Sequence, residues 1–206
     1  MKNIAIFASG SGTNAENIAE YFKTNQDICI KLILSNKPDA IVLKRAETYG
    51  IPTFVFNRHQ FCQTEDVLNI LKKNEISLIV LAGFLWLVPE NILRAYPGRI
   101  INIHPALLPK YGGKGFYGSI VHESVIRSGD KESGITIHYV NEVYDSGQII
   151  FQSRCPVEPG DTPESIANRV HQLEYKYFPV VIERLLNEKP LPITQVEVEG
   201  QVEGDI

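Results

Sequence analysis

The sequence predicts a doubly wound α/β protein, in which helices cover both faces of a mostly parallel sheet. Apolar runs without polar alternation, such as residues 3–9 (NIAIFAS) and 77–83 (SLIVLAG), are typical of strands buried on both faces. Amphipathic segments separate these runs, and this alternation indicates βαβ units. No internal repeat or low-complexity linker interrupts the sequence, so we expect one domain over residues 1–190 and an acidic tail over 191–206.

The first strand is expected to lead through a tight turn into a helix. Gly10 and Gly12 permit the turn, and Thr13 with Glu16 predicts a capping box at the helix start. The helix residues expected to face inward are Ile18, Tyr21 and Phe22.

The rest of the first half repeats this rhythm. A helix at 39–50 ends at Gly50, and a helix at 64–74 is capped by Thr64. The further strands are expected at 30–35, 53–56, 77–83 and 99–104.

The rhythm changes after about residue 110, where a glycine-rich loop spans 110–119. A helix is expected at 120–129, ended by Gly129, and two strands at 133–141 and 147–157 are joined by a hairpin-like turn. We therefore expect an antiparallel portion at the C-terminal end of the sheet. A long amphipathic helix then begins with Thr162 as its cap and Pro163 at its first position.

Composition and charge exclude several classes of protein. Hydrophobic residues make up 44% and charged residues 21% of the 206, which is ordinary for a globular protein with a core. The net charge of −4 disfavours nucleic acid and anionic membranes as partners, since both attract basic surfaces. No apolar run approaches the ~20 residues of a membrane span.

The N-terminal segment and the cysteines predict a cytoplasmic protein. The apolar run at 3–9 is too short for a signal peptide and has no cleavage site. Cys29, Cys62 and Cys155 are odd in number and fit no metal spacing, so we expect reduced thiols and no metal.

Ligands of doubly wound sheets bind at the carboxyl ends of the strands. Four such ends carry most of the Gly and Ser of the first half, and each of three of them carries an Asn, so we expect the four ends to converge. They are ASGSGTN (8–14), LSNKPD (34–39), LAGFLW (81–86) and NIHPALLP (102–109).

The stretch GSGTN (10–14) favours phosphate binding. A glycine-rich turn at a helix N-terminus offers free N–H groups and the positive end of the helix dipole. Gly10, Gly12 and Ala15 nearly match the dinucleotide fingerprint, but Asn36 and Lys37 follow the second strand where that fingerprint needs an acid. A nicotinamide site and a plain tight turn remain the alternatives.

Asn102 and His104 stand two apart on a strand, so they face the same side, and Pro105 ends that strand. An amide beside an imidazole suits stabilisation of an oxyanion and movement of a proton. Asp145 is either a turn residue or a carboxylate that raises the pKa of His104. His138 lies in a strand at a position able to face the site, and His171 shares a helix face with Glu174.

The sequence shows no nucleophile elbow and no metal-ligand spacing. An acid–base site without either favours direct transfer between two bound small molecules.

These motifs together resemble the folate-dependent glycinamide ribonucleotide formyltransferases. GSGTN, LSNK, LAGF, NIHPALLPKY and the later Asp-x-Gly turn occur in the family's order, from Met1 to about Pro190. The resemblance implies a Rossmann-like formyltransferase fold. It also implies transfer of the formyl group of 10-formyltetrahydrofolate, the cosubstrate, to the amine of 5-phosphoribosylglycinamide in de novo purine (IMP) biosynthesis, with no metal.

The resemblance also implies roles for individual residues. Asn102, His104 and Asp145 match the catalytic trio. Gly12, Thr13, Asn14, Gly83, Pro105 and Glu174 match positions that bind the ribonucleotide. The positions that match the folate site are Thr64, Leu85, Trp86, Leu87, Val88, Asn102, Asn141 and Asp145.

The chain also departs from these relatives. Some of them carry an arginine near Thr64 and another at Trp86, and often a histidine at Ile120, where this chain has none of these residues. Lys110 and Lys114 are the substitute cations that we expect to hold the anionic ends of the ligands. The assembly state is left open, with a homodimer as one option.

Other readings differ in what they require. A methionyl-tRNA formyltransferase carries a basic second domain, and a formyltetrahydrofolate hydrolase carries a regulatory domain; the sequence leaves no room for either. The intact trio disfavours a ligand-binding module, because such a module has no need of an acid–base group. A sugar-nucleotide formyltransferase stays open.

Overall fold

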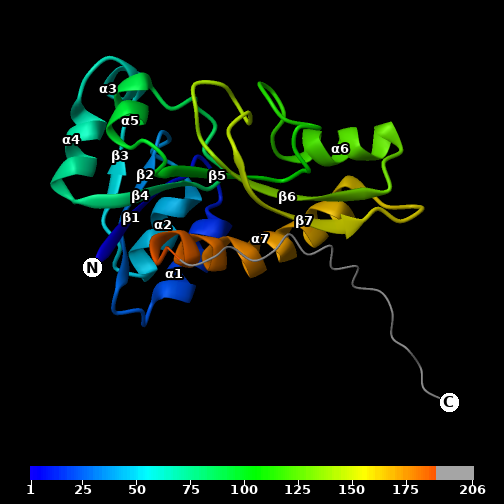
Figure 1. The fold of residues 1–206 in the computed structure, drawn as a ribbon, viewed down its shortest axis with the longest axis horizontal. Coiled ribbons are helices and arrows are strands. Elements are labelled where there is room, and N and C mark those ends of the chain that lie inside the picture. The colour runs from blue at the N-terminus through cyan, green and yellow to red at the C-terminus, as the bar shows by residue number, and fades with distance from the viewer. Residues whose placement is uncertain (189–206) are drawn as a thin grey trace.

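A computed structural model describes residues 1–188 and shows a seven-stranded sheet with helices packed on it (Figure 1). The acidic tail predicted at 191–206 lies outside the described residues. The strands are β1 Lys2–Phe7, β2 Ile28–Ser35, β3 Thr53–Val55, β4 Ile76–Leu81, β5 Ile100–His104, β6 Glu132–Tyr139 and β7 Ile149–Pro156. The helices are α1 Thr13–Phe22, α2 Ile41–Thr48, α3 Arg58–Cys62, α4 Asp66–Lys73, α5 Glu90–Ala95, α6 Ser119–Ser128 and α7 Pro163–Leu186.

The strand order confirms the predicted fold class. The strands lie in the order β3-β2-β1-β4-β5-β6-β7, with parallel pairing from β3 to β5 and antiparallel pairing for β5–β6 and β6–β7. The chain runs outward from β1 to β3 and then returns to the other side of β1 as β4. This reversal creates a switch point between β1 and β4, where doubly wound sheets bind their ligands.

Two apolar cores sandwich the sheet. Ile4 and Ile6 of β1 pack into one core with α1, α2 and α7, while Ala5 and Phe7 pack into the other with α3, α4 and α5. In Figure 1, α1, α2 and α7 lie below the strands, and α3, α4 and α5 lie above them at the upper left. Burial on both faces is the reason that the β1 sequence shows no polar alternation.

The start of α1 differs from the prediction. Its N-cap is Gly12, in a left-handed conformation with φ of +73°, and no side chain caps the helix. The predicted capping box of Thr13 and Glu16 is therefore wrong, and Glu16 forms an ion pair with Arg45 of α2 instead. Tyr21, expected inside, is 44% exposed and donates its hydroxyl proton to Glu183 of α7.

The segment before β4 contains a helix that the sequence did not predict. Asn57 and Gln60 form a capping box that starts the short helix α3, and Thr64 follows its end. Thr64 accepts from the N–H of Asp66, the first residue of α4, at 3.2 Å, so the helix begins two residues later than expected. A further short helix, α5, lies in the leucine-rich segment before β5.

The C-terminal elements agree with the prediction. Gly129 caps α6 in a left-handed conformation, and β6 and β7 form the expected antiparallel pair. Thr162 caps α7 through a reciprocal pair with Ser165, and Pro163 takes the first position. This helix carries Glu174 to the carboxyl ends of the parallel strands.

Candidate active site

A cavity of about 590 Å³ lies at the carboxyl ends of β1, β4 and β5. Three of the four predicted strand ends converge there, because residues 10–14, 82–85 and 102–105 all line it. The fourth stretch, 34–39, does not, since β2 lies one strand further from the switch point. Residues 113–118, Tyr144, Asp145, His122 of α6, and His171 and Glu174 of α7 complete the lining.

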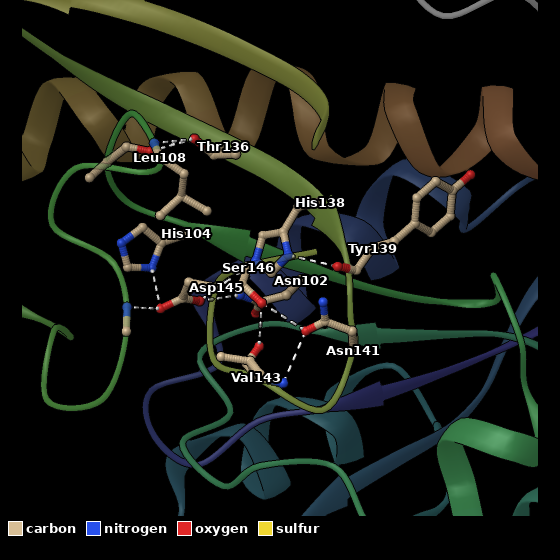
Figure 2. A network of polar contacts seen from close by, with 12 residues as sticks. Asn102, His104, Leu108, Thr136, His138, Tyr139, Asn141, Val143, Asp145 and Ser146 are labelled. Carbon is tan, nitrogen blue, oxygen red and sulfur yellow. Dashed lines mark hydrogen bonds and ion pairs between the residues drawn. The ribbon is translucent and has the colours of Figure 1, made fainter. Parts of the chain in front are cut away.

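The structure brings the predicted trio together. Asn102 and His104 lie on β5, and the loop between β6 and β7 places Asp145 between them (Figure 2). The Oδ2 atom of Asp145 lies 3.6 Å from Nδ1 of His104, and its Oδ1 atom lies 3.5 Å from Nδ2 of Asn102. The N–H of Gly113 donates to Oδ2 of Asp145 at 2.9 Å and fixes the carboxylate. His104 itself is only 4% exposed.

His138 is a fourth polar member of this group, which the sequence marked only as able to face the site. It lies opposite Asn102 in the β5–β6 pairing and is buried. Its Nδ1 donates to the carbonyl of Tyr139 at 2.8 Å, which leaves Nε2, 3.1 Å from Nδ2 of Asn102, to accept from the amide. His138 therefore orients the Asn102 amide, and the cross-strand register was the signal for it.

Burial and charge compete at His104. Burial is the largest influence and lowers the pKa of His104 below its usual value, against the Asp145 carboxylate and the Tyr111 carbonyl, which both raise it. The predicted effect of Asp145 has the right sign, but the net shift is downward. Burial raises the pKa of Asp145, yet its contacts with His138, His104 and Gly113 outweigh burial and keep that pKa below its usual value.

The glycine-rich turn lies against two helices. A Cβ at Gly12 would come within 2.3 Å of Val42 Cγ2, so a glycine is needed for the close approach of α2 as well as for its φ. Asn14 donates from Nδ2 to Oε2 of Glu174 at 2.8 Å. Burial raises the pKa of Glu174 to about 7, partly offset by this hydrogen bond.

Two further histidines line the cavity beside Glu174. Burial lowers the pKa of His122 to about 4, with His171 and His104 adding to the effect, and burial also lowers the pKa of His171. The Nδ1 atom of His122 is buried without a hydrogen-bond partner among the described residues. His122 is buried on α6 together with Val121 and Val125.

Only some of the predicted ligand residues line the cavity. Gly12, Thr13, Asn14, Gly83, Pro105 and Glu174 line it, as does Leu85 of the predicted folate segment. Leu87 and Val88 do not line it; Leu87 is exposed elsewhere on the surface, and Val88 is buried in the core. Thr64 and Asn141 are also outside it; Asn141 instead shapes the loop that carries Asp145, accepting from Val143 N–H and Ser146 Oγ (Figure 2).

The cations are distributed differently from the expectation. Lys114 lines the cavity, but Lys110 faces Asp130 on the far side of its loop. Arg58 of α3 lies outside the cavity lining, with its guanidinium 5.6 Å from the centre of the Trp86 ring. Trp86 packs in turn on Phe56 and Phe61, which hold its ring in place.

Residues 1–188 contain no group of three or more His, Cys, Asp or Glu side chains placed to hold a metal ion. Among the described helices, none has the length and apolar character needed to cross a membrane.

Comparisons with known proteins identify the family of this chain. A family model described as "Formyl transferase" matches residues 2–182. The chain is 42% identical over 193 residues to the phosphoribosylglycinamide formyltransferase of Bacillus subtilis, covering 90% of this chain and 95% of the relative. It is 40% identical over 196 residues to the chloroplastic enzyme of that name from Arabidopsis thaliana, covering 91% and 66% of the two chains.

Solved structures of the same group share the fold. The phosphoribosylglycinamide formyltransferase from Anaplasma phagocytophilum superposes with a TM-score of 0.84 at 33% identity, covering 98% of this chain and 96% of that one. The structure from Bacillus halodurans gives a TM-score of 0.81 at 37% identity, covering 91% and 96%. The chain therefore belongs to the formyl transferase family, within its phosphoribosylglycinamide formyltransferase branch.

Proposed function

We propose that this chain transfers the formyl group of 10-formyltetrahydrofolate to the amine of 5-phosphoribosylglycinamide, with Asn102, His104 and Asp145 at the reaction centre. The observation that carries the proposal is the position of Asp145, within 3.6 Å of His104 Nδ1 and 3.5 Å of Asn102 Nδ2 in a cavity at the switch point. An amide, an imidazole and a carboxylate on one side of a cavity suit attack of an amine on a formyl carbon.

The amine of the ribonucleotide attacks the formyl carbon, forming a C–N bond and leaving negative charge on the formyl oxygen. The Nε2 of His104 is engaged with the Tyr111 carbonyl at 2.7 Å, so the proton on Nδ1 of the charged ring is the one that stabilises this oxyanion. The 3.5 Å contact of Asn102 with Asp145 is too long to hold its hydrogen firmly, so this second amide hydrogen also turns to the oxyanion.

Collapse of the intermediate breaks the bond between the formyl carbon and the folate nitrogen. The attacking amine must lose one proton, and the departing folate nitrogen must gain one, so no net proton is consumed. Asp145, whose pKa lies below its usual value, is ionised; it accepts the amine proton through a water molecule and returns it by the same water to the departing folate nitrogen. The same carboxylate stabilises the charged form of His104 during the reaction.

The ribonucleotide is expected along α1 and α7. The turn at Gly12 presents the N-terminus of α1 to a phosphate, with Thr13 and Asn14 beside it. Glu174 is a hydrogen-bonding partner for ribose hydroxyls, and its raised pKa of about 7 makes a protonated carboxyl available to donate as well as accept.

The folate is expected on the other side of the trio. The exposed side chains of Leu85 and Leu87 and the loop of Asn141 to Asp145 flank this side, where the pterin would lie on apolar surface. Arg58, held over Trp86, and Lys114 are the cations proposed for the carboxylates of the folate tail. Thr64, Trp86 and Val88 are proposed as further folate-binding positions from the sequence resemblance.

The remaining proposals concern the protein as a whole. We assign residues 1–190 to one domain and a cytoplasmic location to the protein. Small molecules are its substrates, and a homodimer is an outcome that sedimentation would test.

A formyl-transfer assay tests the function. Purified protein is mixed with the ribonucleotide and 10-formyltetrahydrofolate, and the deformylated folate is followed by absorbance, with His104→Ala alongside. Turnover that needs the ribonucleotide and collapses in the variant supports the proposal. Folate release without the ribonucleotide would indicate a hydrolase, and turnover only with an amino sugar nucleotide would indicate a different acceptor.

A further inference from the structure

The loop after β5 contacts His104 through its backbone. The carbonyl of Tyr111 accepts from Nε2 of His104 at 2.7 Å, so the position of this carbonyl is part of the environment of the imidazole. Tyr111 has a φ of +56°, a left-handed conformation that is rare for a bulky residue. A backbone in this conformation persists only where its surroundings hold it.

Asp130 holds Tyr111 and the residue before it. The Tyr111 hydroxyl donates to Oδ2 of Asp130 at 2.8 Å, and Nζ of Lys110 lies 3.0 and 2.9 Å from the two carboxylate oxygens. The hydrogen bonds from Lys110 and Tyr111 hold the pKa of Asp130 below its usual value, so it is a carboxylate. Asp130 directly follows Gly129, the cap of α6, and therefore ties the loop to the end of that helix.

The hydrogen-bonded group of Lys110, Tyr111 and Asp130 lies outside the proposed substrate cavity. Lys110, Tyr111 and Asp130 line a second cavity of about 440 Å³, and none of them lines the cavity that contains the trio. Asp130 is linked to His104 by two hydrogen bonds in series, from the Tyr111 hydroxyl to Asp130 and from His104 to the Tyr111 carbonyl.

We propose that Asp130 is a positioning residue for formyl transfer, which holds the Tyr111 carbonyl against Nε2 of His104 through the Tyr111 hydroxyl. A carbonyl only accepts, so it keeps a proton on Nε2 and leaves Nδ1 for the oxyanion. The inference rests on the proposed function as far as reaction rates are concerned, but the state of the His104 ring is measurable without turnover.

The physical consequence has a definite sign. Without the carbonyl, the charged His104 ring loses its hydrogen-bond acceptor at Nε2 and keeps only the 3.6 Å ion-pair contact with Asp145, so its pKa falls further below the usual value. In the neutral ring, the proton is then free to move to Nδ1, towards Asp145. The other titratable groups that act on His104 are Asp145 and His138, with His122 as a further neighbour, and the substitutions below leave all three in place.

The test uses Asp130→Asn and Tyr111→Phe in the full-length chain. Asp130→Asn replaces the carboxylate that accepts from Tyr111 with a weaker, neutral acceptor. Tyr111→Phe removes the hydroxyl that donates to Asp130 and keeps the aromatic ring. Glu132→Gln is the matched control, since it breaks the ion pair with Arg154 on the wall of the same second cavity without touching Tyr111. Asp130→Glu retains a carboxylate and is expected to rescue part of the activity.

Two readouts separate positioning from a structural role. In both variants we expect kcat to fall about tenfold, the effect of one lost hydrogen bond, while the KM of each substrate stays within about twofold. In ¹⁵N-labelled protein, two-bond ¹H–¹⁵N spectra should show the His104 titration at lower pH and more of the Nδ1–H tautomer. The control should match the unsubstituted protein in both.

The proposal is overturned if His104 keeps its titration midpoint and tautomer in both variants, whatever happens to thermal stability. A wild-type chain that fails to turn over the ribonucleotide would instead contradict the proposed function. The spectra would still decide the role of Asp130 in that case.

Discussion

The Nδ2 atom of Asn14 lies 2.8 Å from Oε2 of Glu174, joining the first helix to the last across 160 positions of sequence. Asn14 begins the proposed phosphate site, and Glu174 stands where a ribose would lie. One hydrogen bond therefore connects the binding of the ribonucleotide to the packing of α1 on α7.

Glu174→Gln is expected to remove a pH dependence of stability. The carboxyl titrates at about 7 in the folded chain, against 4.5 ordinarily, so between these values the folded state holds more protons than the unfolded state. Stability from this group is therefore present below pH 4.5 and declines as pH rises to 7, by about 3 kcal/mol in total.

Urea unfolding across pH 4.5–8 measures this decline as the difference between the two proteins. Glu183→Gln is the control, since it removes the exposed Tyr21–Glu183 contact between the same helices and should keep the wild-type slope. Parallel stability curves for wild type and Glu174→Gln would contradict the buried, protonated carboxyl.

Asp145→Asn is expected to shift the titration of His104 to lower pH. The carboxylate raises the pKa of His104 against the larger effect of burial, so its removal lets burial act unopposed by a charge. We also expect kcat to fall by about 10²–10⁴-fold, the usual worth of acid–base catalysis.

Histidine NMR titration measures the midpoint of His104, and single-turnover rates measure the loss of catalysis. Glu142→Gln makes the same change of charge on an exposed residue of the same loop and should leave the midpoint in place. A midpoint in Asp145→Asn that equals or exceeds that of the wild type would reject the assignment.

Gly12→Ala is expected to destabilise the chain by about 1–3 kcal/mol, because it combines a left-handed backbone with a steric clash. The new Cβ would lie 2.3 Å from Cγ2 and 2.8 Å from Cα of Val42, and the second contact is with backbone that cannot rotate away. Gly10→Ala, with nothing within 4 Å of its Cβ, is the control for stability. Equal denaturation midpoints for the two variants would contradict the prediction, because they would show that α2 can move away from the new Cβ at little cost.

Arg58→Ala is expected to raise the KM for the formyl folate about five- to tenfold and to leave kcat within about twofold, because one charge-assisted contact is lost in ground state and transition state alike. Arg99→Ala removes a similar cation from the face of Tyr96, where the separation is 5.1 Å, and should leave both constants unchanged. A larger effect on the ribonucleotide KM than on the folate KM would place Arg58 in the other subsite.

Much of the fold followed from local signals. The unbroken apolar runs predicted the buried strands, and Thr162, Pro163 and Gly129 marked helix ends correctly. The errors occurred where local signals compete. Thr13 and Glu16 have the pattern of a capping box, but Gly12 is the N-cap of α1 and Glu16 forms an ion pair with Arg45. A pattern of four consecutive residues cannot predict an ion pair with Arg45, which lies 29 positions further along the chain.

The sequence alone was enough to predict the strands of the sheet and the described helices other than α3 and α5. It was also enough to place Asn102 and His104 on the same side of a strand, because alternation along a strand is a local property. It also carried the family motifs that point to Asp145. Three features came from the three-dimensional structure: the contact between His138 and the Asn102 amide, the hydrogen bond of Tyr111 to Asp130, and the effect of burial on the pKa of His104, which exceeds that of Asp145. These depend on distances between segments far apart in the chain and on the removal of water, and neither is set by the residues nearby in sequence.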